Sequence, residues 1–155
     1  MARISAEHVN IFLMAASKVI SETCNLTTKV GKPYIRNNTF TKDSIVIMIG
    51  VTGEMQGQVM LAFKKPVALM IASKMMYMEV KELDEISTSA ICELGNMIMG
   101  NASTAFSVKN IGIDITPPTM CEGDFTVSGA VASMCIPIYI SDTDFVELNL
   151  CIRQD

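Results

Sequence analysis

The sequence has no tryptophan and a single histidine, His8. Because Ser-His and Cys-His catalytic sites need a histidine as the base, a single histidine argues against nucleophilic catalysis of this kind. No two cysteines stand at C-x-x-C spacing, which argues against a zinc site. The odd number of cysteines and their apolar neighbours favour reduced, buried thiols over a disulfide framework. The five are scattered singly: Cys24, Cys92, Cys121, Cys135 and Cys151.

Long hydrophobic runs and blocks of basic charge are also missing. No apolar run reaches the roughly 18 residues that a membrane-spanning helix needs, and the N-terminus lacks the basic-then-apolar pattern of a secretion signal. The net charge is −4 and Lys64-Lys65 is the one adjacent basic pair, which disfavours nucleic-acid binding. We therefore expect a cytoplasmic protein with no membrane and no nucleic-acid partner.

Half of the residues are hydrophobic, which is typical of a globular chain. At 155 residues, and without a Gly/Ser/Pro-rich linker, residues 1–155 are expected to form one domain. Most of the thirteen methionines sit within apolar patterns, so we interpret them as core residues rather than as a binding surface.

Hydrophobic periodicity and turn residues predict an α+β fold, in which helices pack on one face of an antiparallel sheet. A turn is expected at Val51–Gly53, and an extended passage at Pro117-Pro118. The predicted helices are Ile4–Cys24, Pro66–Met78 and Asp84 to about Val108, and the predicted strands are Val30–Ile35, Ser44–Ile49, Gln56–Phe63, Ala130–Ile140 and Phe145–Ile152.

A weak internal repeat is visible in the order of these segments. Glu7-x-x-Asn10 in the first helix is followed by Pro33, and Glu93-x-x-Asn96 in the third helix is followed at similar spacing by Pro117. A β-hairpin comes next in both halves. We predict two helix-Pro-hairpin units related by pseudo-twofold symmetry.

The third helix carries a narrow polar stripe. A helix turns about 100° per residue, so Glu93 lies about 40° from Ser89, Asn96 about 20° to its other side, and Gly100 on the same line. A carboxylate beside an amide can hold a cation and orient a water molecule. Spacing alone does not exclude an ordinary solvated helix face.

Two further features weigh toward function. Asn is a poor helix former, yet Asn96 and Asn101 occur in mid-helix, and Gly95 and Gly100 each cost about 1 kcal/mol relative to Ala. A helix that accepts these residues is expected to present its face closely to something. Packing of the helix on the sheet is the rival explanation, and it accounts for the glycines better than for the amides.

These residues carry a family resemblance over nearly the whole chain. Ser89-x-x-x-Glu93-x-x-Asn96 with Pro117 about twenty residues later resembles the signature of the CheC/CheX/FliY family of chemotaxis phosphatases. The segments Gly31–Pro33 and Val51–Gly57 also resemble the CheX branch.

The resemblance implies dephosphorylation of a CheY-type response regulator at its aspartyl phosphate. It implies that Asn96 orients the attacking water and that Glu93 pairs with the regulator's active-site Lys. The Mg²⁺ would belong to the phosphorylated partner, so no cofactor of the chain's own is expected. Ser89 and Gly100 are possible supporting residues, and no specific role is assigned to Ser89.

Alternatives of other classes remain. Glu7 and Asn10 could form a second site, but Arg3 stands where the motif has Ser or Asp, so we interpret them as a degenerate relic. The chain could instead be a non-catalytic adaptor that binds a receiver domain, or a structural component like the flagellar switch middle domain. A homodimer is expected by resemblance, and also because Ala130–Ile140 or Phe145–Ile152 could be an apolar sheet edge that needs cover.

Overall fold

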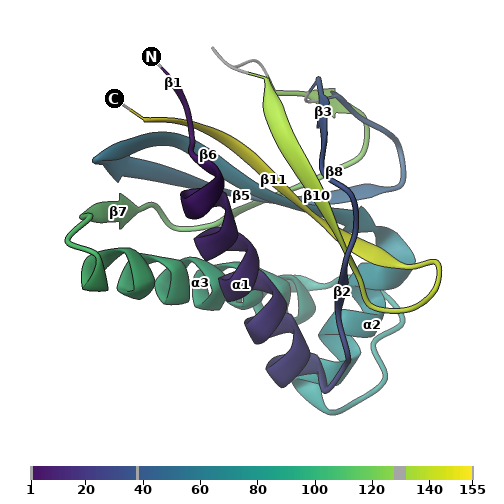
Figure 1. Ribbon diagram of the computed structural model, residues 1–155. Coiled ribbons are helices and arrows are strands. Elements are labelled where there is room, and N and C mark those ends of the chain that lie inside the picture. Colours follow the sequence, from purple (N-terminus) through teal and green to yellow (C-terminus); the bar gives the residue numbers. More distant parts are fainter. Residues whose placement is uncertain (1, 38, 128–131, 155) are drawn as a thin grey trace.

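The fold places three helices against one face of a mostly antiparallel sheet, as the sequence predicts (Figure 1). The computed structural model describes residues 2–37, 39–127 and 132–154. Its helices are α1 (Ala6–Cys24), α2 (Lys65–Met76) and α3 (Glu85–Val108). Its strands are β1 (Ala2–Arg3), β2 (Lys29–Val30), β3 (Tyr34–Arg36), β4 (Thr39–Phe40), β5 (Ser44–Gly53), β6 (Met55–Lys64), β7 (Ile113–Ile115), β8 (Thr119–Glu122), β9 (Phe125–Thr126), β10 (Ser133–Tyr139) and β11 (Phe145–Gln154).

The described strands of the main sheet run in the order β2-β10-β11-β6-β5-β7. Two more strands lie at the outer positions of this sheet: β3 pairs with β10, as β2 does, and β8 pairs with β5, as β7 does. The same pairing pattern therefore occurs on both sides of the central β6–β11 pair. This order is compatible with the predicted internal repeat, which itself stays a prediction.

The core lies between the sheet and the helices. The alternate residues of β5 that point toward the helices, Ile45, Ile47 and Ile49, are at most 1% exposed. All three helices contribute buried apolar side chains to this layer, among them Phe12, Ile71 and Phe106. Because this face of the sheet is continuous, α3 is held flat against β5 and its opposite side is left to solvent.

The other face of the sheet is covered in part by a small two-stranded sheet of β4 and β9. Phe40 and Phe125 stack with ring centroids 5.1 Å apart, and Phe40 belongs to a second buried cluster with Val46 and Met60. The sequence did not predict β4, β9 or the N-terminal strand β1. Strands of two residues are too short to show a hydrophobic periodicity.

Several sequence predictions need correction. Val51–Gly53 is not a turn but the end of β5, and the hairpin turns at Glu54, between Gly53 and Met55. The passage around Pro117 and Pro118 is extended as predicted, but strands β7 and β8 flank it. Of the predicted strand Ala130–Ile140, residues 130 and 131 lie outside the described residues.

The expectation of an apolar edge at β10 or β11 is wrong. β10 pairs with β2 and β3 on one side and β11 on the other, and β11 pairs with β6. Both strands therefore lie in the interior of the sheet, and neither is an edge strand. Within the described part of the chain, the longer sheet edges are β2–β3 and β7–β8, and the two-residue strand β1 forms a further short edge by pairing with β11 alone.

Candidate docking face of helix α3

The start of α3 is fixed by reciprocal capping. The Asp84 carboxylate accepts a hydrogen bond from the Ser87 backbone N–H at 2.8 Å, and the Ser87 hydroxyl accepts one from the Asp84 backbone N–H at 2.8 Å. The bonds from the backbone and side chain of Ser87 lower the pKa of Asp84 below its usual value. Because Ser87 is 1% exposed, the first turn of the helix has a defined orientation, and Ser89 follows two residues after Ser87.

The predicted stripe lies on the outward side of this helix. Ser89, Glu93 and Gly100 are exposed and Asn96 is half-buried, whereas Ile91, Leu94 and Ile98 on the other side are fully buried. Along the helix axis, Glu93 and Asn96 are about 4.5 Å apart, from three residues at about 1.5 Å each. The structure therefore brings the four predicted stripe residues together on one accessible face.

The carboxylate and the amide of this stripe are unengaged. Within the described residues, the side chains of Glu93 and Asn96 make no hydrogen bond and no ion pair. By contrast, the nearby amide of Asn101 donates to the carbonyl of Met97 at 2.8 Å. A polar group left unpaired by its own chain can offer its full hydrogen-bonding capacity to another molecule.

The two glycines of α3 have different surroundings. A Cβ at Gly95 would approach the methyl groups of Ile47 and Ile49 to 3.1 Å, so Gly95 lets the helix lie close to β5. A Cβ at Gly100 would meet nothing within 4 Å. Sheet packing therefore explains Gly95 and leaves Gly100 unexplained, one turn beyond Asn96 on the exposed side.

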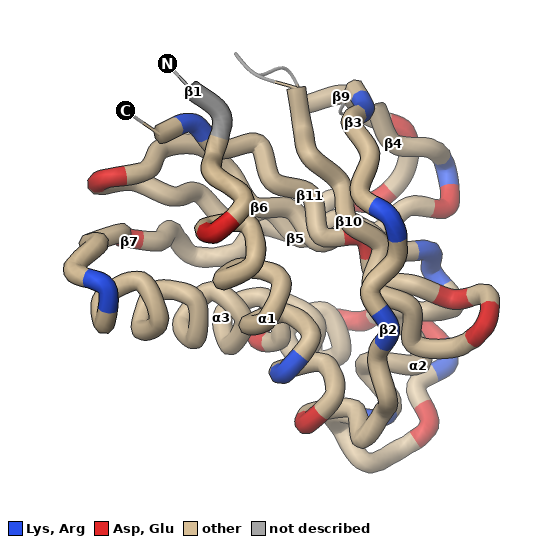
Figure 2. The backbone as a smooth tube through the Cα atoms, viewed as in Figure 1, with Lys and Arg blue, Asp and Glu red and all other residues tan. Residues whose placement is uncertain are grey.

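The electrostatic setting of the stripe is simple. Beyond its first turn, α3 carries one charged residue, Glu93, and the helix is uncharged along most of its length (Figure 2). Lys109 follows the last residue of the helix as its C-cap. A lone carboxylate on a neutral face gives a partner's cation a single place to bind.

In the second motif, Glu7-x-x-Asn10 on α1, the carboxylate is already paired within the chain. Glu7 on α1 forms an ion pair with Lys109, with Oε1 and Nζ 2.7 Å apart, whereas Asn10 is exposed. The hydrogen bond from Lys109, and then its charge, lower the pKa of Glu7 below its usual value. The carboxylate that would dock a partner's Lys is thus already paired with a Lys of its own chain.

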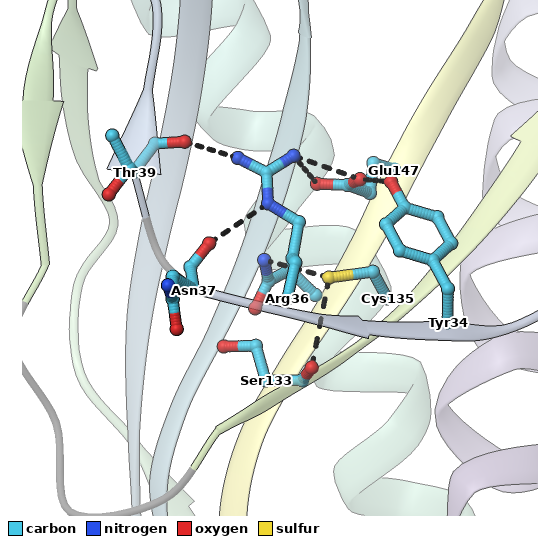
Figure 3. Close-up of polar contacts among 8 residues, drawn as sticks. Tyr34, Arg36, Asn37, Thr39, Ser133, Cys135 and Glu147 are labelled. Carbon is cyan, nitrogen blue, oxygen red and sulfur yellow. Dashed lines mark hydrogen bonds and ion pairs between the residues drawn. The ribbon is translucent and has the colours of Figure 1, made fainter.

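A buried polar cluster lies away from α3, on the opposite face of the sheet (Figure 3). Glu147 of β11 is 3% exposed and accepts hydrogen bonds from Tyr34 and Arg36, which both reach it from β3 across β10. Arg36 also donates to the carbonyls of Asn37 and Thr39. Burial, then the bond to Glu147, raises the pKa of Tyr34 to about 12. We interpret the cluster as a clasp that holds a short edge strand.

Sequence reasoning missed this clasp, although Glu147 is the one charged residue of the predicted strand Phe145–Ile152. Such a position requires a partner, and that requirement was the available signal. Burial, then the charge of Glu147, raises the pKa of Cys135 to about 12, so this thiol is not a reactive one. A cavity of about 440 Å³ opens beside the clasp, and no residue of α3 lines it.

Neither a metal centre nor a membrane span emerges from the parts of the chain that the structure describes. No three His, Cys, Asp or Glu side chains there come together as a metal site would need, and no helix is both long and apolar enough to cross a bilayer.

Comparison with known proteins gives consistent matches. The sequence model of the family "Chemotaxis phosphatase CheX" matches residues 45–140. The CheY-P phosphatase CheX of Thermotoga maritima is 32% identical over 97% of this chain and 99% of its own length. Among solved structures, a CheX–CheY–BeF3–Mg²⁺ complex from Borrelia burgdorferi matches with a TM-score of 0.80 and 27% identity, covering 98% of this chain and 100% of the other.

A CheC-like superfamily protein from a Shewanella species has the same fold, with a TM-score of 0.85 at 24% identity. The match covers 97% of this chain and 99% of the Shewanella chain. At this identity the likeness concerns the fold alone.

Proposed function

The chain belongs to the CheX family of chemotaxis phosphatases, and on that premise we propose that it hydrolyses the aspartyl phosphate of a CheY-type response regulator. The observation that carries the proposal is the exposed face of α3, where Glu93 and Asn96 make no hydrogen bond or ion pair within the described residues. The Thermotoga relative is a CheY-P phosphatase, and the Borrelia neighbour was solved with CheY, which supports the choice of partner.

Asn96 is proposed to enter the partner's active site and orient the attacking water. A carboxamide can accept a hydrogen bond from that water through its oxygen and donate one to a phosphoryl oxygen through its nitrogen. The water oxygen bonds to phosphorus as the bond from phosphorus to the aspartyl oxygen breaks, and the aspartate leaves with the electron pair. The water's protons pass to phosphate and solvent. Positioning supplies most of the acceleration, as in other phosphoryl transfers.

Glu93 is proposed to fix the docking geometry by pairing with the regulator's active-site Lys. It lies one helical turn from Asn96 on the same face, so one helix delivers both groups. The Mg²⁺ belongs to the partner, and this chain supplies no cofactor. The amide is neutral, so its role does not depend on a titrating group of this chain.

The decisive experiment measures phosphate release from phosphorylated receiver domains with the wild type and Asn96→Ala. We expect the substitution to slow release by about 10²–10³-fold, as the loss of one positioned polar group does in other enzymes, while the receiver still binds. Asn101→Ala is the matched control, because it removes the same group from the same helix about 140° away from Asn96. Equal release by wild type and Asn96→Ala would refute the mechanism.

The same assay separates the proposal from its alternatives. An adaptor of this fold would bind the receiver without accelerating release, and a structural component like the flagellar switch middle domain would bind no receiver.

We further propose that residues 1–155 form a single domain and that the protein is a cytoplasmic homodimer. Ser89 and Gly100 are proposed to support Glu93 and Asn96 on the docking face.

A further inference from the structure

Ile86 is an exposed apolar residue at the start of α3. It is 67% exposed, although it lies in a helix whose other isoleucines, Ile91 and Ile98, are fully buried. Its neighbour Ser87 points inward and makes the capping bonds, so the orientation of this turn is fixed. Ile86 therefore faces outward because of how α3 begins.

Ile86 lies on the same side of α3 as the polar stripe. Single exposed apolar residues are common on protein surfaces. Ile86, however, stands seven residues before Glu93, which is about two turns and leaves only about 20° between them. It also stands three residues before Ser89. The apolar side chain thus continues the line of the polar stripe toward the helix N-terminus.

Interface size places Ile86 within reach of a partner docked on Glu93 and Asn96. A standard interface buries about 800 Å² on each partner, equivalent to a disc of about 16 Å radius. Along the helix axis, Ile86 is about 10 Å from Glu93 and about 15 Å from Asn96. A receiver domain centred on the stripe would cover Ile86 and remove it from water.

We propose that Ile86 is an apolar anchor for the receiver domain. It contributes binding energy and fixes the position of the receiver along α3, while Glu93 and Asn96 act at the phosphorylated site. This inference rests on the proposed function, because it takes the same helix face as the docking surface. The receiver is expected to present an apolar depression beside its phosphorylation site. Side chains that fill a well-packed pocket and lose their contact with water carry much of the binding energy of an interface.

The test compares Ile86→Ala with Val108→Ala. Val108 is also an exposed apolar residue of α3, at 80%, but it lies about 22 Å beyond Glu93 along the helix axis and about 60° around the helix from it. We expect Ile86→Ala to raise KM about tenfold with kcat within about twofold, as losing one well-packed anchor does. Val108→Ala should match the wild type, and Ile86→Met should recover most of the affinity.

A binding measurement keeps the two proposals distinguishable. The Kd for a receiver domain activated with beryllofluoride and Mg²⁺ does not depend on catalysis, and Ile86→Ala should raise it about tenfold, in parallel with KM. An unchanged Kd and KM in Ile86→Ala, with phosphate release still lost in Asn96→Ala, would overturn the anchor and leave the proposed function standing. Binding without accelerated release by the wild type would overturn the proposed function, and the anchor would be decided by the Kd alone.

Discussion

A buried carboxylate is tolerated only where it is paired, and Glu147 has two partners from the edge strand β3. Arg36 approaches both carboxylate oxygens at 3.4 Å and also lies over the ring of Phe40, 4.8 Å from its centroid. One guanidinium therefore ties β3, β4 and β11 together. These contacts assign the cluster a stabilising role, separate from the proposed catalytic face.

Arg36→Ala should lower the free energy of unfolding by about 3 kcal/mol, because it leaves the Glu147 carboxylate buried beside Tyr34 alone. Urea denaturation measures the change, and Lys32→Ala, an exposed cation next to the same edge strand, is the control. The double variant Arg36→Met/Glu147→Met should cost less than Arg36→Ala, since no charge is left unpaired. An Arg36→Ala protein as stable as the wild type would contradict the clasp.

The ion pair of Glu7 with Lys109 predicts that the second motif, Glu7-x-x-Asn10, does not contribute to phosphate release. Asn10→Ala should leave phosphate release within about twofold of the wild type, because the carboxylate that would dock a partner beside it is already paired. The same phosphate-release assay checks this. A large loss of turnover would mean that both motifs act.

The pH dependence of this pair has a defined sign. Folding lowers the pKa of Glu7 below the usual 4.5, through the bond to Lys109 and then its charge. Its stabilising contribution is therefore present above that usual value and is lost as the pH falls through the lowered folded value. NMR titration of Lys109→Gln should show the Glu7 pKa returning upward, and the stability difference from the wild type should vanish in acid.

At the scale of secondary structure, α3 shows what local sequence determines. The prediction of Asp84 to about Val108 matches Glu85–Val108, because the capping residue, the acidic first turn and the apolar periodicity all lie within the segment. The exposure of Glu93 follows from the same periodicity. Its proposed role does not, and comes instead from the family resemblance.

Short strands show what local sequence leaves open. β7 and β8 have three and four residues and become strands by pairing with residues of β5 that lie sixty or more positions earlier. The order that places β10 and β11 inside the sheet is likewise set by pairing between distant segments. The contact of Glu7 with Lys109 joins residues 102 apart, so periodicity could not predict it.

The two glycines of α3 predict opposite effects of alanine. Gly100→Ala should stabilise the protein by about 1 kcal/mol, because its Cβ meets open space and alanine favours the helix. The same methyl group should hinder docking and raise KM severalfold. Gly95→Ala should destabilise by about 1–2 kcal/mol, since its Cβ would press on the buried Ile47 and Ile49.

Urea denaturation and steady-state phosphate release distinguish these outcomes. A Gly100→Ala protein that is more stable and fully active would show that Gly100 has no part in docking. A Gly95→Ala protein more stable than the wild type would contradict the close packing of α3 on β5.

At the scale of the whole molecule, the two longer edges of the sheet differ in the kind of side chain they expose. The β2–β3 edge leaves Val30, Tyr34 and Ile35 at 44%, 40% and 51% exposure. The β7–β8 edge instead carries an ion pair of Glu122 with Lys65, with oxygen and nitrogen 3.5 Å apart. Charged groups on an edge discourage strand pairing, whereas exposed apolar groups favour cover by another chain.

We therefore expect the proposed homodimer to form through the β2–β3 edge, in place of the interior strands β10 and β11 that the sequence suggested. Light scattering at micromolar concentration should give twice the 16.9 kDa of one chain. Ile35→Lys should give a monomer, because it places a charge in the apolar edge, while Thr119→Lys on β8 should remain dimeric. A monomeric wild type would exclude the dimer, and a dimeric Ile35→Lys would move the interface elsewhere. Since α3 lies on the helical face and contributes nothing to this edge, the monomer should retain the kcat of the wild type.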